Sequence, residues 1–228
     1  MRPTVLLFDI DGTLITTGGA GRRAIVRAFA DRYGRGDAFD HFNFGGMTDR
    51  AIVREGLRTI GHSFDEAEID AAIADYVRVL EDEVARATTY RLHDGMLEAL
   101  DAAKARARCA VGLGTGNIEE GARLKLARVG VWERFGFGGF GSDHEDRPTL
   151  IAMGADRGAR RLGVPVADCR VVIIGDTPRD VDAAHRNGFE CLAVATGGAS
   201  ADELRAAGAR RVFRDLKESG AIDALLDD

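Results

Sequence analysis

The sequence is poor in cysteine and contains no long apolar run. Its three cysteines, Cys109, Cys169 and Cys191, are an odd number whose spacing fits neither a disulfide framework nor a zinc site. No apolar run approaches the roughly 20 residues that a membrane helix needs, and the N-terminus carries no secretory signal. We therefore expect a cytoplasmic protein with free thiols and no membrane partner.

Lysine is also scarce, since only Lys104, Lys125 and Lys217 are present. The 31 basic residues are outnumbered by 37 acidic ones, so the formal net charge is −6. A nucleic-acid surface needs a net positive patch, so we expect no nucleic-acid partner. The length of 228 residues and the hydrophobic content of 45% are typical of one or two globular domains. No feature of the sequence indicates an oligomeric state.

Continuous apolar runs alternate with segments of helical periodicity. Such runs predict strands that are buried on both faces, as in a parallel sheet. The alternation predicts an α/β fold with a doubly wound, mainly parallel sheet. The expected strands cover residues 4–8, 109–114, 170–174 and 191–195, with a shorter candidate at 135–140, and the expected helices cover 118–129, 148–162 and 178–187.

The connection between the first two strands is much longer than a crossover requires. A helix over residues 96–107 is sufficient for that crossover. The preceding stretch is itself helical, and Ser63-x-x-Glu66 has the pattern of a capping box. We predict an α/β core of residues 1–15 and 88–228 and a small all-helical cap domain of residues 16–87. A cap inserted there lies over the carboxyl ends of the strands, where open α/β sheets bind ligands.

A pair of acids follows the first predicted strand. Asp9 and Asp11 are two residues apart, so both carboxylates lie on the same side of the strand end, and Gly12 allows the chain to turn away. Two carboxylates at one place repel each other and need a cation or a shared proton. The pair therefore indicates a divalent metal and acid–base or nucleophilic chemistry, although a simple turn with Asp9 as a cap has the same pattern.

Three further motifs each follow a predicted strand. Thr115-Gly116-Asn117 opens a helix and is suited to a phosphoryl group, or supplies only a helix cap. Asp176 and Asp180 offer oxygen ligands for Mg²⁺, or cap the following helix and complement its dipole. Arg147 is the best placed cation for balancing carboxylates, or forms an ordinary surface ion pair.

Together, these motifs resemble those of the haloacid dehalogenase-like (HAD) hydrolase superfamily. The acid pair, the hydroxyl residue, the cation and the final acids occur in that order over nearly the whole chain. The predicted cap resembles that of the phosphoglycolate phosphatase and β-phosphoglucomutase-like branch. Arg147 departs from the commoner lysine, which keeps the charge but alters the geometry. The resemblance implies a Rossmann-like core and hydrolysis of phosphoric monoesters.

The resemblance also implies a role for each matched residue. Asp9 would attack phosphorus and form an aspartyl-phosphate, and Asp11 would protonate the leaving group and then activate water. Mg²⁺ would be held by the side chains of Asp9 and Asp176 and the main-chain carbonyl of Asp11, while Asp180 would orient a metal-bound water or a ligand. The phosphate-binding residues would be Gly12, Thr13, Thr115, Gly116, Asn117 and Arg147, of which Thr115 and Arg147 are also counted as catalytic.

The expected substrate is a small phosphorylated metabolite, for which phosphoglycolate and sugar phosphates are candidates. Family members that cleave carbon–halogen bonds lack an acid at the position of Asp11, so its presence favours phosphoryl chemistry. A phosphosugar mutase with the same acids and a non-catalytic metal-binding module are the alternatives. In the predicted cap, Gly46, Thr48 and Arg50 belong to a loop that is a candidate for substrate specificity, with Arg50 reaching a second anionic group.

Overall fold

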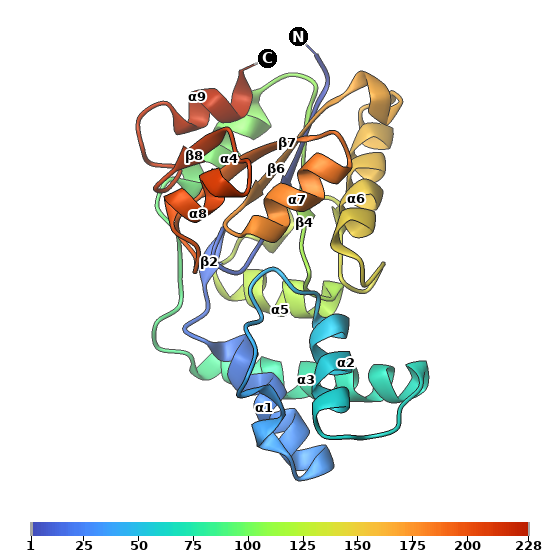
Figure 1. Ribbon diagram of the computed structural model, residues 1–228. Coiled ribbons are helices and arrows are strands. Elements are labelled where there is room, and N and C mark those ends of the chain that lie inside the picture. Colours follow the sequence, from blue (N-terminus) through green and yellow to red (C-terminus); the bar gives the residue numbers. More distant parts are fainter. Residues whose placement is uncertain (1, 228) are drawn as a thin grey trace.

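The computed structural model describes residues 2–227 and is built around a parallel sheet with helices on both faces (Figure 1). The strand order is β5-β4-β1-β6-β7-β8, and every neighbouring pair is parallel. This arrangement confirms the predicted α/β fold with a doubly wound sheet. The strands are β1 (Thr4–Phe8), β4 (Cys109–Gly114), β5 (Gly138–Gly139), β6 (Arg170–Gly175), β7 (Glu190–Val194) and β8 (Arg211–Phe213).

The central strand β1 is fully buried and contributes side chains to two apolar cores. Leu6 and Phe8 pack against α4 (Met96–Ala105), α5 (Glu119–Arg128) and α9 (Ala221–Leu226) on one face of the sheet. Val5 and Leu7 belong to the other core, which includes α6 (Arg147–Arg161), α7 (Pro178–Arg186) and α8 (Ala201–Ala206). The alternation follows from the two-residue period of a strand, and burial on both faces explains the continuous apolar run.

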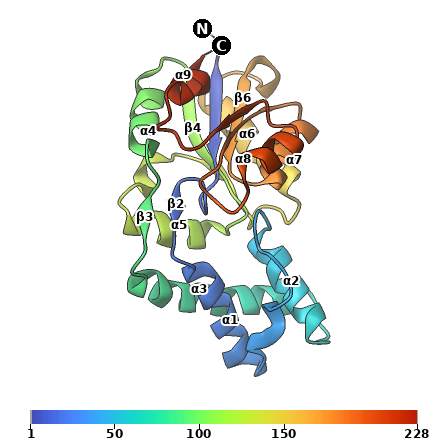
Figure 2. The same ribbon diagram turned by 60° about the vertical axis from the view of Figure 1, so that its left-hand side comes forward.

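A separate group of helices lies beyond the carboxyl ends of the strands. The helices α1 (Ala20–Tyr33), α2 (Asp49–Thr59) and α3 (Glu66–Arg86), with a short 3-10 helix at Gly36–Phe39, share their own apolar cluster. We call this group the helical unit; its helices all fall within the predicted cap. Figure 2 shows that the chain enters it after β2 (Ile15–Thr16) and returns through β3 (Arg91–Leu92), which pair antiparallel.

Two local predictions require correction. The expected strand at 135–140 is reduced to β5, because only Gly138 and Gly139 pair with β4. The expected capping box at Ser63 is wrong, since α3 begins two residues later than that pattern implies. Its N-cap is Asp65, whose carboxylate accepts a hydrogen bond from the Glu68 N–H. Among residues 2–227, no helix combines the length and apolar character needed to cross a membrane.

The order of the strands determines where a ligand can bind. From β1 the chain proceeds to β4 on one side and later to β6 on the other, so β1 lies at the topological switch point. Open α/β sheets bind ligands in the crevice outside the carboxyl ends at such a point. The loops after β1, β4 and β6 all emerge there, facing the helical unit (Figure 1).

Candidate active site

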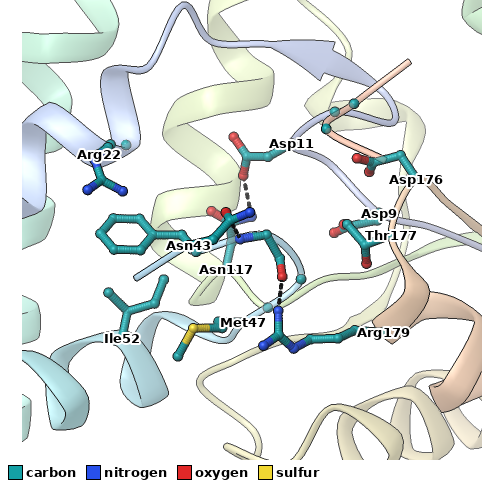
Figure 3. Close-up of a pocket in the computed structure, with 18 of the residues that line it drawn as sticks. Asp9, Asp11, Arg22, Asn43, Met47, Ile52, Asn117, Asp176, Thr177 and Arg179 are labelled. Carbon is teal, nitrogen blue, oxygen red and sulfur yellow. Dashed lines mark hydrogen bonds between the residues drawn. The ribbon is translucent and has the colours of Figure 1, made fainter. Parts of the chain in front are cut away.

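A cavity of about 610 Å³ lies between the carboxyl edge of the sheet and the helical unit. It is of the size found for sites that hold small organic ligands. In Figure 3, Asp9 and Asp176 lie on one side of the cavity, Arg22 and Ile52 on the opposite side, and Asp11 between them. The cavity therefore joins acids of the sheet to side chains of the helical unit.

Three buried carboxylates form the centre of the sheet side. Asp9 follows β1, Asp176 follows β6, and Asp180 lies in the first turn of α7. One carboxylate oxygen from each lies within 4.8 Å of the others. Asp9 and Asp176 are 167 positions apart in the sequence, and Asp180 lies 4 positions after Asp176. The parallel sheet thus brings distant acids together. Their oxygen donors suit a hard divalent cation such as Mg²⁺.

Arg147 supplies the positive charge beside these acids. It is the first residue of α6, which is capped by Asp146 and has proline in its first turn. Its Nη2 lies 3.0 Å from Asp9 Oδ2 and 2.5 Å from Asp180 Oδ1, and its guanidinium is almost fully buried. Arg147 thus faces the acid cluster, in agreement with a charge-balancing role and not with a surface ion pair.

The remaining oxygens of the cluster are held by neighbouring hydroxyl groups. The Thr177 hydroxyl and N–H donate to Asp180 Oδ2, in the capping box that begins α7. The Thr13 hydroxyl donates to Asp176 Oδ1 over 2.7 Å. Gly12, with φ of +83°, lets the chain pass so close to Asp176 that a Cβ atom there would lie 2.4 Å from its Oδ2. Thr13, expected to bind phosphate, thus contacts a carboxylate and does not line the cavity.

Burial and nearby negative charge raise the pKa values of Asp9 and Asp176. Desolvation raises the pKa of Asp9 to about 6, and the Arg147 guanidinium opposes part of this shift. Burial, together with the charges of Asp180 and Asp9, raises the pKa of Asp176 well above its usual value. Asp9 and Asp176 therefore resist ionisation beside a single arginine. A bound dication would favour the charged carboxylates.

The carboxylate of Asp11 faces a different set of partners. Its Oδ2 accepts hydrogen bonds from Lys125 Nζ over 2.6 Å and from Asn117 Nδ2 over 2.8 Å. Lys125 is buried and lies in the second turn of α5. The sequence motifs did not identify Lys125, because it lies inside a helix and not in a loop after a strand. No pattern on α5 distinguishes it from an exposed lysine, since Arg128 lies one turn further along the same helix.

The loop after β4 supplies the remaining predicted phosphate-binding residues. Thr115 is fully buried, and its hydroxyl accepts hydrogen bonds from the N–H and side-chain amide of Asn117. Gly116 and Asn117 line the cavity together with Gly12 and Arg147, whereas Thr115 does not. Gly116 also lies against Met47 of the helical unit, where a Cβ atom would be 2.2 Å from the Met47 carbonyl oxygen.

The predicted specificity residues of the helical unit are placed differently from one another. Gly46 lines the cavity, and its carbonyl oxygen accepts a hydrogen bond from Arg147. Thr48 caps α2 and donates to the Glu145 carbonyl, so it joins the helical unit to the core. Arg50 does not line the cavity, because Asp70 and Glu66 bind its guanidinium. The lining arginines besides Arg147 are Arg22 and Arg179, which the sequence analysis did not select.

Fold and site together define an α/β enzyme with a buried acidic centre at the carboxyl edge of its sheet. The chain belongs to the haloacid dehalogenase-like hydrolase family, whose model matches residues 3–188. This match confirms the family expected from the motifs.

Individual relatives are similar over almost the full length of the chain. The probable phosphatase IndB of Dickeya dadantii (strain 3937) is 26% identical over 245 residues, which cover 99% of this chain and 96% of that protein. CbbY from Rhodobacter sphaeroides, solved in complex with phosphate, has a TM-score of 0.71 at 20% identity and covers 98% of this chain and 100% of its own. A hydrolase from Pseudomonas syringae has a TM-score of 0.70 at 21% identity, with coverage of 93% and 94%. The two solved structures share the fold.

Asp49 offers a test of the electrostatics of the cavity. Burial raises its pKa from 3.8 to about 6, although Lys125 opposes the shift. Folded Asp49 keeps its proton longer than unfolded Asp49, so its contribution to stability is complete below pH 4 and is lost as the pH rises through 6. We expect Asp49→Asn to gain roughly 2 to 3 kcal/mol relative to the wild type between pH 4 and 7. The asparagine oxygen can still accept the Ile118 N–H bond that Asp49 accepts now.

Urea unfolding of both metal-free proteins across this pH range measures the difference. Asp40→Asn, at an exposed position, is the matched control and is expected to give a curve parallel to that of the wild type. A pH-independent difference between Asp49→Asn and the wild type would contradict the assigned burial effect.

Proposed function

We propose that this protein is a Mg²⁺-dependent phosphatase that hydrolyses small phosphorylated metabolites through an aspartyl-phosphate on Asp9. The observation that carries the proposal is the division of the acids into two groups. Asp9 lies in a buried cluster with Asp176 and Asp180, whereas Asp11 lies apart, toward the helical unit. Such a division suits one acid for attack on phosphorus and another for proton transfer. The name of the relative IndB supports the same activity.

The donor set fits a divalent cation. The acid cluster offers carboxylate oxygens from separate elements, and Arg147 is the one cationic side chain among the described residues that is recorded in ion pairs with them. Both oxygens of Asp180 already accept hydrogen bonds, so Asp9 and Asp176 are the better direct ligands. The main-chain carbonyl of Asp11 would complete the protein ligands. When bound, Mg²⁺ supplies charge neutralisation for the phosphoryl oxygens and the carboxylates.

Asp9 is the nucleophile of the proposed reaction. Phosphoryl transfer is achieved mainly by positioning and by balancing negative charge. Arg147 holds Asp9 Oδ2 and lines the cavity, so it orients the carboxylate and is available to the oxygens of the transferred group. The backbone after β4, through Gly116 and Asn117, borders the same space.

Asp11 is the proposed acid and base. Its carboxylate is 41% exposed and lies between the acid cluster and the helical unit, on the side where the leaving alcohol has room. It would donate a proton to the leaving-group oxygen as its bond to phosphorus breaks, so that this group departs as the alcohol, and would then accept a proton from the water that attacks the aspartyl-phosphate. The free thiols of the described chain agree with a reducing compartment such as the cytoplasm.

Hydrolysis of p-nitrophenyl phosphate tests the proposal. We expect Asp9→Asn to lower kcat by about 10³-fold or more, because the amide cannot accept the phosphoryl group. We expect EDTA to abolish turnover and added Mg²⁺ to restore it. Asp40→Asn, which changes an exposed aspartate, is the control for the loss of one carboxylate. Undiminished activity in Asp9→Asn or in the presence of EDTA would refute the mechanism.

The phosphosugar mutase remains the second candidate, because it uses the same acids and returns the phosphoryl group to the substrate. Phosphorus NMR of the enzyme with a sugar monophosphate separates the two reactions. A phosphatase releases inorganic phosphate, whereas a mutase forms an isomer without release.

A further inference from the structure

We infer that Lys125 is a positioning residue that, together with Asn117, holds the Asp11 carboxylate on the leaving-group side of the cavity. The inference rests on the proposed function, in which Asp11 transfers the proton to the leaving alcohol. It assigns a second cation to the reaction, distinct from Arg147, which pairs with the acid cluster.

The burial of Lys125 is the first observation. Lysine is almost never fully buried unless it is paired, because transferring an unpaired ammonium out of water is costly. Lys125 is only 3% exposed, and its ammonium lies 2.6 Å from both Asp11 Oδ2 and Asn117 Oδ1. The helix α1 covers it, since a Cβ atom on Gly21 would lie 3.4 Å from Nζ. Two short charge-assisted contacts thus compensate for its removal from water.

The hydrogen bonds of Asn117 make the arrangement directional. Its amide oxygen accepts from Lys125, and its amide nitrogen donates to Asp11 Oδ2 and to Thr115 Oγ1. With all three groups bound, the amide has one favourable orientation. Asp11 Oδ2 therefore receives two donors, while no hydrogen bond to its Oδ1 is recorded among residues 2–227. One oxygen is anchored and the other is left for the leaving alcohol.

The leaving group provides a readout that a merely structural role would not change. Departure of p-nitrophenolate needs little protonation, whereas departure of benzyl alcohol needs an acid. We expect Lys125→Met to lower kcat/KM for benzyl phosphate by about 100-fold and to change kcat/KM for p-nitrophenyl phosphate by less than about threefold. Lys125→Arg, which retains a cation, is expected to recover part of the loss. Lys104→Met, at an exposed lysine of α4, is the matched control.

Each result of the two-ester assay either supports or contradicts the positioning role of Lys125. Equal losses for both esters, or no loss for either, would overturn the positioning role. Inactivity of the wild type toward both esters in Mg²⁺ would instead refute the proposed function. Thermal unfolding accompanies each assay, and if Lys125→Met does not fold, Lys125→Gln is assayed with the same two esters and judged by the same difference between them.

An independent observation concerns the alcohol part of the substrate. The side chains of Ile25, Phe44, Met47 and Ile52 line the cavity from the helical unit, and we call them the apolar wall. From it, also resting on the proposed function, we infer that the leaving alcohol is uncharged and carries an apolar or aromatic surface. Burial of such a surface against the apolar wall favours binding, because it removes apolar area from water.

The surroundings of the apolar wall favour an uncharged group over a second anionic group. Arg22 donates to the carbonyl oxygens of Phe39 and Phe42 and stacks 4.5 Å from the centre of the Phe44 ring, so its guanidinium is already engaged. Arg179 donates to the Gly45 carbonyl. Acidic side chains also line the cavity here, including Asp49 and Glu203. Among the described residues that line this side of the cavity, a carboxylate such as that of phosphoglycolate would meet acidic side chains and arginines that already donate to carbonyl oxygens.

A direct comparison of substrates tests the inference. We expect kcat/KM for benzyl phosphate to exceed that for phosphoglycolate by about 10-fold or more, and Ile52→Ser to lower it for benzyl phosphate by about 10-fold. Methyl phosphate, which has no surface to place on the apolar wall, is the control and should be affected less than about twofold by Ile52→Ser. A preference for phosphoglycolate, or equal effects of Ile52→Ser on benzyl and methyl phosphate, would overturn the inference. Hydrolysis of none of the three would count against the proposed function itself.

Discussion

Repulsion among the buried carboxylates of Asp9, Asp176 and Asp180 is the constraint on which the rest of the site depends. Their oxygens lie within 4.8 Å of one another, and Arg147 is the cation paired with them. Such a cluster persists only because each acid is anchored to a separate strand end or helix start. Burial raises the pKa of Asp9, which is the electrostatic signature of a site short of positive charge. The fold thus maintains an excess of negative charge, which a bound dication would offset before an anionic phosphoryl group could enter.

The two buried cations contact different acids of the site. Arg147 begins α6 and contacts the acid cluster, while Lys125 lies on α5 and contacts Asp11. Arginine suits the first position because its planar guanidinium can bridge two carboxylates, and lysine suits the second because its ammonium is a compact point charge. The separation keeps Asp11 from being drawn into the cluster around Asp9. Asp9 and Asp11 can therefore differ in environment although they are two residues apart.

Sequence reasoning was most accurate where one local pattern determines the structure. The strand at residues 4–8 was predicted because a parallel strand buried on both faces needs a continuous apolar run. The acids at the strand ends were found for the same reason, because strand ends mark the edge of the sheet. Lys125 was missed because its importance arises from packing under α1, which no local pattern reports. Arg50 was selected as a loop cation, but its neighbours on α3 bind it, and those neighbours are distant in the sequence.

The contacts between the helical unit and the core are of a different kind from those inside the acid cluster. Arg147 and Arg179 donate to carbonyl oxygens of Gly46 and Gly45, and the Asp49 N–H donates to the Gly116 carbonyl. The acid cluster itself is built from core residues alone, and the helical unit is joined to the core through the short strands β2 and β3. Separation of the helical unit would therefore break these bonds, the Arg54–Glu145 ion pair and the packing of Ile118 against the helical unit, and it would leave Asp9 and its neighbouring acids in place. The acid cluster belongs to the core, and the helical unit lines the opposite side of the cavity and covers Lys125.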